Sequence, residues 1–102
     1  MFHPALFKGA NVVVTGAGRG IGLEVARQFL DCGAHVLLHG GREPDAAVPD
    51  FLEEALEEAR AHIVHADFLT PQGVSEVARY ADNLFEQVDV LVNNAGTMVS
   101  RF

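Results

Sequence analysis

Thr15-Gly16-Ala17-Gly18-Arg19-Gly20-Ile21-Gly22 is a glycine-rich stretch that lies between two apolar segments. The run Val12-Val13-Val14 precedes it, and an apolar-periodic segment from Ile21 to Leu30 follows it. A strand, a glycine-rich turn and a helix in this order form the first half of a nucleotide-binding unit. The turn lets the backbone approach a pyrophosphate closely, and the helix start supplies free N–H donors.

The spacing of these glycines differs from G-x-G-x-x-G, which would need glycine at position 21 or 23, where the chain has Ile21 and Leu23. The pattern is instead T-G-x-x-x-G-x-G, through Thr15, Gly16, Gly20 and Gly22. A tight connection without a ligand is the plain alternative, because glycines also mark ordinary loops. The strand–turn–helix context favours a phosphate site.

Composition bounds the class of protein. The chain has 102 residues, 49% of them hydrophobic and 21% charged, which fits one small globular domain. A net charge of −7 without a Lys/Arg run argues against a nucleic-acid partner. The single cysteine, Cys32, fits a reducing compartment and predicts a cytoplasmic location. No apolar stretch is long enough to span a membrane, and Met1 to Pro4 does not begin a signal peptide.

Apolar periodicity predicts alternating strands and helices. The strands are expected at 10–15, 35–39, 62–65 and 88–92, and the helices at 21–30, at 50–59 and from Pro71, with Thr70 as N-cap. The expected buried helix positions are Ile21, Val25, Ala26, Phe29, Leu30, Phe51, Leu52, Ala55, Leu56, Ala59, Val74, Val77, Ala78, Ala81, Leu84 and Phe85. This β-α-β-α-β-α-β pattern predicts a parallel α/β sheet with right-handed crossovers.

With Asn93-Asn94-Ala95-Gly96 at the end of the last strand, the chain resembles the N-terminal half of the short-chain dehydrogenase/reductase family. The glycine stretch matches that family's cofactor motif, and Ala66-Asp67-Phe68 falls where the family places an aspartate near the adenine ring. The resemblance implies a Rossmann-like, doubly wound parallel sheet with strand order 3-2-1-4. Residues 1–102 would then form a dinucleotide-binding half-domain.

The resemblance also implies roles for single residues. Gly16, Gly20 and Gly22 would shape the pyrophosphate turn, and Gly18, Arg19 and Ile21 would also belong to the cofactor site. Asp67 would accept a hydrogen bond from the adenine amino group, and Phe68 would back the ring pocket. Asn93 would tie the fourth strand to the first, while Asn94, Ala95 and Gly96 would line the adenosine ribose and the cofactor cleft. For Asp67, a turn-capping role is the alternative.

The end of the second predicted strand bears on the choice of cofactor. NAD-binding units place an acidic residue there for the ribose 2′-hydroxyl, whereas this chain has no carboxylate until Glu43. Arg42 and Arg19 are placed to attract a 2′-phosphate, which favours NADP over NAD. The adjacent Glu43 and a plain surface role for both arginines are the arguments against it.

The histidines predict no metal site. His35 and His39 share a strand face but lie roughly 13 Å apart, too far for one ion. His62 and His65 point to opposite faces. All four are interpreted as surface or strand-end histidines.

Catalysis in the family needs a tyrosine, a lysine four residues later and a serine upstream. Here the only tyrosine is Tyr80, position 84 is Leu84, and the only lysine is Lys8. We therefore assign no catalytic residue and expect a truncated NADP-dependent reductase. The complete enzyme would transfer hydride between NADP(H) and a carbonyl or alcohol substrate. A stand-alone nucleotide-binding or subunit-interaction module is the alternative.

The last predicted strand, Val88 to Val92, would leave an apolar edge with unpaired backbone groups, which is a template for association. We therefore expect a homo-oligomer rather than a well-behaved monomer.

Overall fold

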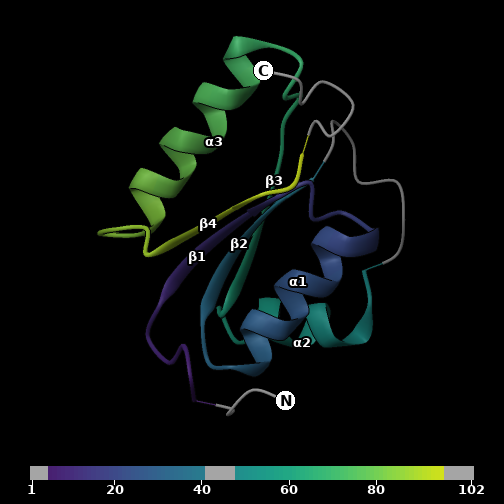
Figure 1. Ribbon diagram of the computed structural model, residues 1–102, viewed down its shortest axis with the longest axis vertical. Helices are drawn as coiled ribbons and strands as arrows, with labels where there is room; N and C mark the ends of the chain where they lie inside the picture. Colours follow the sequence, from purple (N-terminus) through teal and green to yellow (C-terminus); the bar gives the residue numbers. More distant parts are fainter. Residues whose placement is uncertain (1–4, 41–47, 96–102) are drawn as a thin grey trace.

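The computed structural model describes residues 5–40 and 48–95 as strands that alternate with helices (Figure 1). The elements are β1 (Asn11–Thr15), α1 (Gly20–Asp31), β2 (His35–Gly40), α2 (Asp50–Glu57), β3 (Ala61–His65), α3 (Pro71–Leu84) and β4 (Val90–Asn93). The predicted order of elements is confirmed, and most boundaries agree within one or two residues.

The four strands form one parallel sheet in the order β3-β2-β1-β4. This is the predicted 3-2-1-4 order of a doubly wound, Rossmann-like half. Helices α1 and α2 cover one face of the sheet and α3 covers the other (Figure 1). The carboxyl ends of all four strands therefore meet at one rim, where the residues of both sequence motifs lie.

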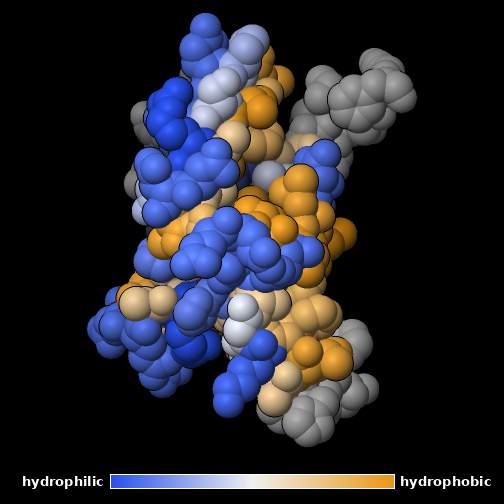
Figure 2. All heavy atoms as spheres, turned by 90° about the vertical axis from the view of Figure 1, so that its left-hand side faces the viewer, coloured by the Kyte–Doolittle hydropathy of each residue, from blue (hydrophilic) through white to orange (hydrophobic). Residues whose placement is uncertain are grey.

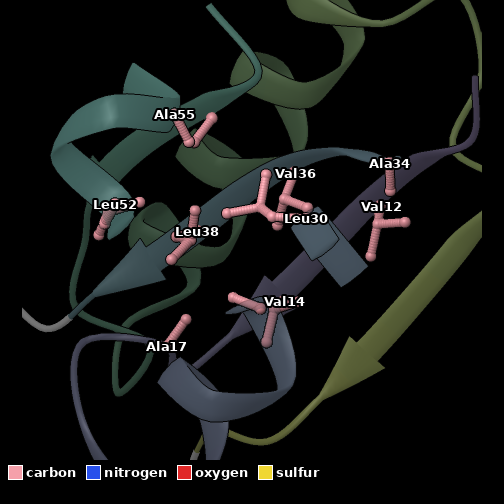
Figure 3. Packing of buried hydrophobic residues seen from close by; sticks show 11 residues of the cluster. Val12, Val14, Ala17, Leu30, Ala34, Val36, Leu38, Leu52 and Ala55 are labelled. Atoms are coloured by element: carbon pink, nitrogen blue, oxygen red, sulfur yellow. The ribbon is translucent and has the colours of Figure 1, made fainter. Parts of the chain in front are cut away.

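The face under α1 and α2 holds the larger apolar core. Alternate residues of the two inner strands, β1 and β2, point into it, among them Val12, Val36 and Leu38, which are at most 2% exposed. Figure 3 shows these side chains between the sheet and the helix residues Leu30, Leu52 and Ala55. Since the strands are apolar on both faces, the sheet needs helices on both sides.

The opposite face is covered less completely. Val13 and Leu37 pack there against Val77, Ala81 and Phe85 of α3 and its end. Leu91 of β4 pairs in register with Val13 and so points to the same face, yet its side chain is 62% exposed. Figure 2 views the side of the molecule where α3 and β4 lie and shows apolar surface among hydrophilic atoms. Within the described residues, β4 is thus an edge strand with apolar surface beside it.

Two of the expected buried positions on α3 are wrong. Val74 is 47% exposed and Ala78 is also exposed, because α3 faces the sheet with Gly73, Val77 and Ala81. These three residues are spaced four apart, and Val74 and Ala78 lie one position around the helix from them. The acidic residues Glu53, Glu54 and Glu57 of α2 are, in contrast, all exposed.

Ile21 and Ala59 are also not buried. Ile21 is 77% exposed, because the buried residue in the first turn of α1 is Gly22. Ala59 lies beyond the end of α2, which ends at Glu57, and has a left-handed φ of 61°. It therefore belongs to the turn into β3, with its side chain exposed.

Strand β4 begins two residues later than expected. The Asp89 carboxylate accepts a hydrogen bond from the Asn11 amide at 2.8 Å, and the Asp89 amide donates to the Asn11 carbonyl at 2.8 Å. This reciprocal pair replaces strand pairing at that position, so the regular ladder starts at Val90, opposite Val12.

Candidate functional site

The glycine turn joins the carboxyl end of β1 to α1. Gly16 has a φ of 64° and Gly20 a φ of 63°, both in the left-handed region that glycine adopts readily. Between them the chain leaves the sheet and begins α1, so these two residues set the path of the turn.

Gly16 and Gly22 are also required by close packing within the protein. A Cβ on Gly16 would lie 2.9 Å from the Cα of Ala95, and a Cβ on Gly22 would overlap the Gly16 carbonyl oxygen. A Cβ on Gly20, in contrast, would meet no atom within 4 Å. Of the three motif glycines, Gly20 is therefore the one that opens onto space a ligand can fill.

Thr15, the last residue of β1, binds the segment after β4. Its hydroxyl oxygen accepts hydrogen bonds from the amides of Asn94 at 2.9 Å and Ala95 at 3.1 Å. The same hydroxyl donates to the Asn93 side-chain oxygen at 3.2 Å, and the Asn94 side chain donates to the Gly16 carbonyl at 3.1 Å. The two sequence motifs, almost eighty residues apart, thus form one hydrogen-bonded joint.

The N-terminus of α1 lacks a cap from the described part of the chain. Arg19 is its N-cap residue and makes no side-chain cap hydrogen bond, and the first turn contains no acidic residue. The N–H groups and positive dipole end of α1 can therefore face an anion. With the open space at Gly20, this arrangement fits the pyrophosphate of a dinucleotide.

Asp67 and Phe68 lie in the loop after β3, at the same rim of the sheet. The Asp67 side-chain oxygen accepts a hydrogen bond from the Leu69 amide at 2.9 Å, which is the turn-capping role considered as the alternative. Phe68 is partly buried, and its ring stacks on the ring of His39 with centroids 3.9 Å apart. A contact of Asp67 with adenine stays a prediction.

His39 lies at the carboxyl end of β2, as a strand-end histidine, but it is buried at 3% exposure and is not a surface residue. Its ring nitrogens lie 3.1 Å from the Gly16 amide nitrogen and 2.8 Å from the Ala66 carbonyl oxygen. Burial lowers the pKa of His39 from its ordinary value. Its position between the glycine turn and the β3 end therefore disfavours the charged form of the ring.

The remaining predicted site residues lie as follows. Gly18, Arg19 and Ile21 are exposed on the turn and the start of α1. Arg42 and Gly96 lie outside the described residues, so their roles rest on the sequence alone.

Other kinds of site find no support in the described ranges 5–40 and 48–95. No group of three His, Cys, Asp or Glu side chains there could hold a metal ion. Tyr80 is 39% exposed on α3. No described helix is long and apolar enough to cross a membrane. A hollow of about 640 Å³, lined in part by His35 and His62, lies at the amino ends of the strands, away from both motifs.

Sequence reasoning missed Thr15 and His39 as supports of the site. A signal existed for Thr15, because it is a hydroxyl residue that directly follows the apolar run Val12 to Val14 at the end of β1. For His39 the alternation along β2 showed which face it shares, but not what covers that face.

Comparison with known proteins identifies the family. The model of the short chain dehydrogenase family matches residues 10–102. The chain therefore belongs to the short-chain dehydrogenase/reductase family, a class of oxidoreductases.

Individual relatives agree with this assignment. The chain is 33% identical over 91 residues to the D-beta-hydroxybutyrate dehydrogenase of Cupriavidus necator, an alignment that covers 89% of this chain and 35% of that enzyme. Its fold is similar to that of the RhlG/NADP active-site complex of Pseudomonas aeruginosa, with 31% identity and a TM-score of 0.75 over 93% of this chain and 38% of that one.

It is also similar to the NADH-dependent reductase A1-R' complexed with NAD, with 30% identity and a TM-score of 0.76 over 92% of this chain and 39% of that one. The chain thus spans little more than a third of the length of these relatives. Neighbours solved with NADP and with NAD support a nicotinamide dinucleotide as the cofactor of this fold.

Proposed function

We propose that residues 1–102 form the dinucleotide-binding portion of a short-chain oxidoreductase. The observation that supports this most is the joint around the uncapped start of α1, where Thr15 and Asn94 bind the glycine turn to the segment after β4. A joint of this kind aligns a pyrophosphate site with the neighbouring rim of the sheet.

In this proposal the N–H groups at the start of α1 bind the pyrophosphate beside Gly20. Asp67 and Phe68 form the adenine side of the site, and Asn94, Ala95 and Gly96 line the adenosine ribose and the cleft. The bound cofactor would supply a hydride donor or acceptor. This chain's own residues bind and orient it.

We propose NADP(H) as the preferred cofactor. Arg19, exposed at the N-cap of α1, and Arg42 would contact the 2′-phosphate. Calorimetric titration should show an advantage of NADP(H) over NAD(H) of about 1.5–3 kcal/mol, as expected for charge-assisted contacts. The double variant Arg19→Ala/Arg42→Ala should erase it. Equal affinity of the unmodified chain for both cofactors would refute the preference.

The reaction we propose for the complete enzyme is hydride transfer between NADP(H) and a small carbonyl or alcohol substrate, in the cytoplasm. Tyr80 and Leu84 do not supply the family's tyrosine–lysine pair, so the 102 residues alone should bind cofactor without reducing carbonyl compounds. A reading frame that continues past Phe102 into Tyr-x-x-x-Lys would support the enzyme. A protein without that pair that still binds nucleotide would support the non-catalytic module.

We further propose that the protein is a homo-oligomer and that a chain of these 102 residues associates through β4. Leu91 is 62% exposed and Val88 is 42% exposed beside an edge strand. Light scattering at micromolar concentration should show species larger than the monomer. A monodisperse monomer with a cooperative melt would contradict this and favour the stand-alone module.

A further inference from the structure

His39 and His35 lie on the same face of the same strand, yet only His39 is covered. His35 is exposed at the amino end of β2, whereas His39 at the carboxyl end is 3% exposed. Phe68 stacks on the His39 ring with a centroid distance of 3.9 Å and an interplanar angle of 18°. Part of the cover on His39 therefore comes from the loop proposed to form the adenine side of the site.

The partners of the His39 ring fix its protonation state. The Gly16 amide, 3.1 Å from Nδ1, can only donate a hydrogen bond, and the Ala66 carbonyl, 2.8 Å from Nε2, can only accept one. The ring must therefore be neutral, with its proton on Nε2 and a lone pair on Nδ1. The backbone carbonyl of His39 also accepts a hydrogen bond from the Ala17 amide at 2.7 Å.

These contacts join two segments that are distant in sequence and flank the proposed cofactor site. The ring nitrogen Nδ1 and the carbonyl oxygen hold the first two residues of the glycine turn, while Nε2 and the ring face hold Ala66 and Phe68. Because the pyrophosphate and adenine parts of a dinucleotide are covalently joined, the distance between their two binding segments matters for affinity.

We propose that His39 is a positioning residue for the cofactor. Its neutral imidazole holds the Gly16 amide and the Ala66–Phe68 segment in register, and protonation of Nδ1 releases the Gly16 amide and weakens dinucleotide binding. This inference rests on the proposed function of the site.

Protonation has a defined place and direction. An added proton would occupy Nδ1 and point at the Gly16 N–H, so the ring could no longer accept there. Burial lowers the pKa of His39, the Ala66 carbonyl opposes this shift, and the nearby His65 adds to it. The contribution of the neutral ring is therefore present above the ordinary histidine pKa of about 6.5 and is lost as pH falls through the lowered pKa of His39.

Among the described residues, the other titratable groups on the elements around His39 are His65 at the end of β3, Asp67 in the following loop, Arg19 in the glycine turn, and Glu76, Arg79, Tyr80 and Asp82 on α3. Of these, His65 is the one whose charge acts on His39, so it is the group to vary as a comparison.

The test is calorimetric titration of the 102-residue chain with NAD⁺ between pH 8 and pH 5.5. NAD⁺ is the probe because it lacks the phosphate monoester of NADP, which itself titrates at a pKa of about 6. His39→Phe keeps the ring and its stack but removes both nitrogens, and it should weaken binding about tenfold at pH 8 through the orphaned Gly16 amide. His39→Asn places an oxygen near Nδ1 and should recover most of that loss.

The pH dependence of NAD⁺ affinity distinguishes a positioning role of His39 from a role in packing alone. The affinity of the unmodified chain should fall toward pH 5.5, by less than about tenfold because the pKa of His39 is lowered, whereas His39→Phe and His39→Asn should show a flat profile. His35→Phe, on the same strand face, should behave as the unmodified chain.

Two results would overturn the inference: a tight-binding His39→Phe, or an acid loss that persists in His39→Asn and disappears in His65→Gln. If the unmodified chain bound neither NAD⁺ nor NADP⁺ at any pH, the proposed function itself would fail, which is a different outcome.

Discussion

The starts of α1 and α3 lie at the same rim of the sheet, but only one of them is satisfied by the described chain. At α3, the Thr70 hydroxyl accepts a hydrogen bond from the Gly73 amide at 3.0 Å and donates to the Asp67 carbonyl at 3.0 Å. At α1, the N-cap residue Arg19 makes no side-chain cap. Both starts contain a glycine, Gly22 or Gly73, whose added Cβ would overlap a preceding carbonyl oxygen.

The difference shows which helix start is kept for a ligand. α2 offers a third case, with Asp50 and Glu53 supplying negative charge in its own first turn. Two of the three helix starts are thus stabilised by their own side chains, as helix termini generally require. The start of α1 has hydrogen-bond donors and a positive dipole end without such a partner, and a bound anion would complete it.

The largest effect should follow from closing the space beside the start of α1. A Cβ on Gly20 meets no protein atom within 4 Å, so Gly20→Val should fold while its side chain occupies the proposed pyrophosphate site. We expect NADPH affinity to fall at least about a hundredfold in calorimetry, with the far-UV circular dichroism nearly unchanged. The left-handed φ adds a strain of about 1–2 kcal/mol, a cost that still allows folding.

Gly20→Ala and Gly22→Ala are the matched controls. Gly20→Ala should show the same loss to a smaller degree, because its side chain is shorter. Gly22→Ala should instead lower the midpoint of thermal unfolding, since its Cβ overlaps the Gly16 carbonyl inside the protein. Unchanged NADPH affinity in Gly20→Val would show that the open space is not the pyrophosphate site.

The fold could be predicted from the sequence because its signals are local. Apolar strands such as Val12 to Val14, the helix periodicity and the turn glycines each specify one element, and the alternation of elements specifies a parallel sheet. The incorrect burial predictions concern helix residues that do not face the sheet. Ile21 and Val74 have helical spacing but lie beyond the strip of each helix that contacts the sheet.

The residues that support the site act through long-range contacts, so they could be predicted only in part. The two motifs were recognisable, but their hydrogen-bonded joint through Thr15 spans almost the whole chain. His35 and His39 follow the same alternation but differ in burial, and the contacts on His39 include the ring of Phe68, about thirty residues later. No pattern within β2 carries that information.

An intermediate effect is expected at Thr15, the residue that binds the α1 side of the rim to the segment after β4. Thr15→Ala removes a buried hydroxyl that accepts hydrogen bonds from the Asn94 and Ala95 amides. The free energy of unfolding should fall by about 1–2 kcal/mol, because two partly buried amides lose their hydrogen-bond acceptor. Thr15→Ser keeps the hydroxyl and should lose less than about 1 kcal/mol, for one methyl group. Equal denaturant midpoints for both variants would show that the joint adds no stability.

The smallest effects should come from removing the cap of α3 and adding a cap to α1. These two changes test directly whether the two helix starts differ. Thr70→Ala removes the cap of α3 and should lower the free energy of unfolding by about 1 kcal/mol, with NAD⁺ affinity unchanged within about twofold. Arg19→Ser places a capping hydroxyl at the start of α1, where the extended backbone, with φ −165° and ψ 174°, resembles that of an N-cap residue. Without nucleotide, the free energy of unfolding of this variant should be higher by up to about 1 kcal/mol.

Arg19→Ser should nevertheless bind NAD⁺ more weakly, by about threefold, because its hydroxyl competes with the pyrophosphate for the same N–H groups. NAD⁺ has no 2′-phosphate, so the loss of a contact between Arg19 and that phosphate cannot produce this result. Arg19→Ala is the control, since it removes the same charge without adding a cap and should not gain stability. The two helix starts differ in function if Arg19→Ser raises the free energy of unfolding and lowers NAD⁺ affinity, while Thr70→Ala changes the free energy of unfolding alone. If both caps changed stability alone, α1 would be an ordinary helix start.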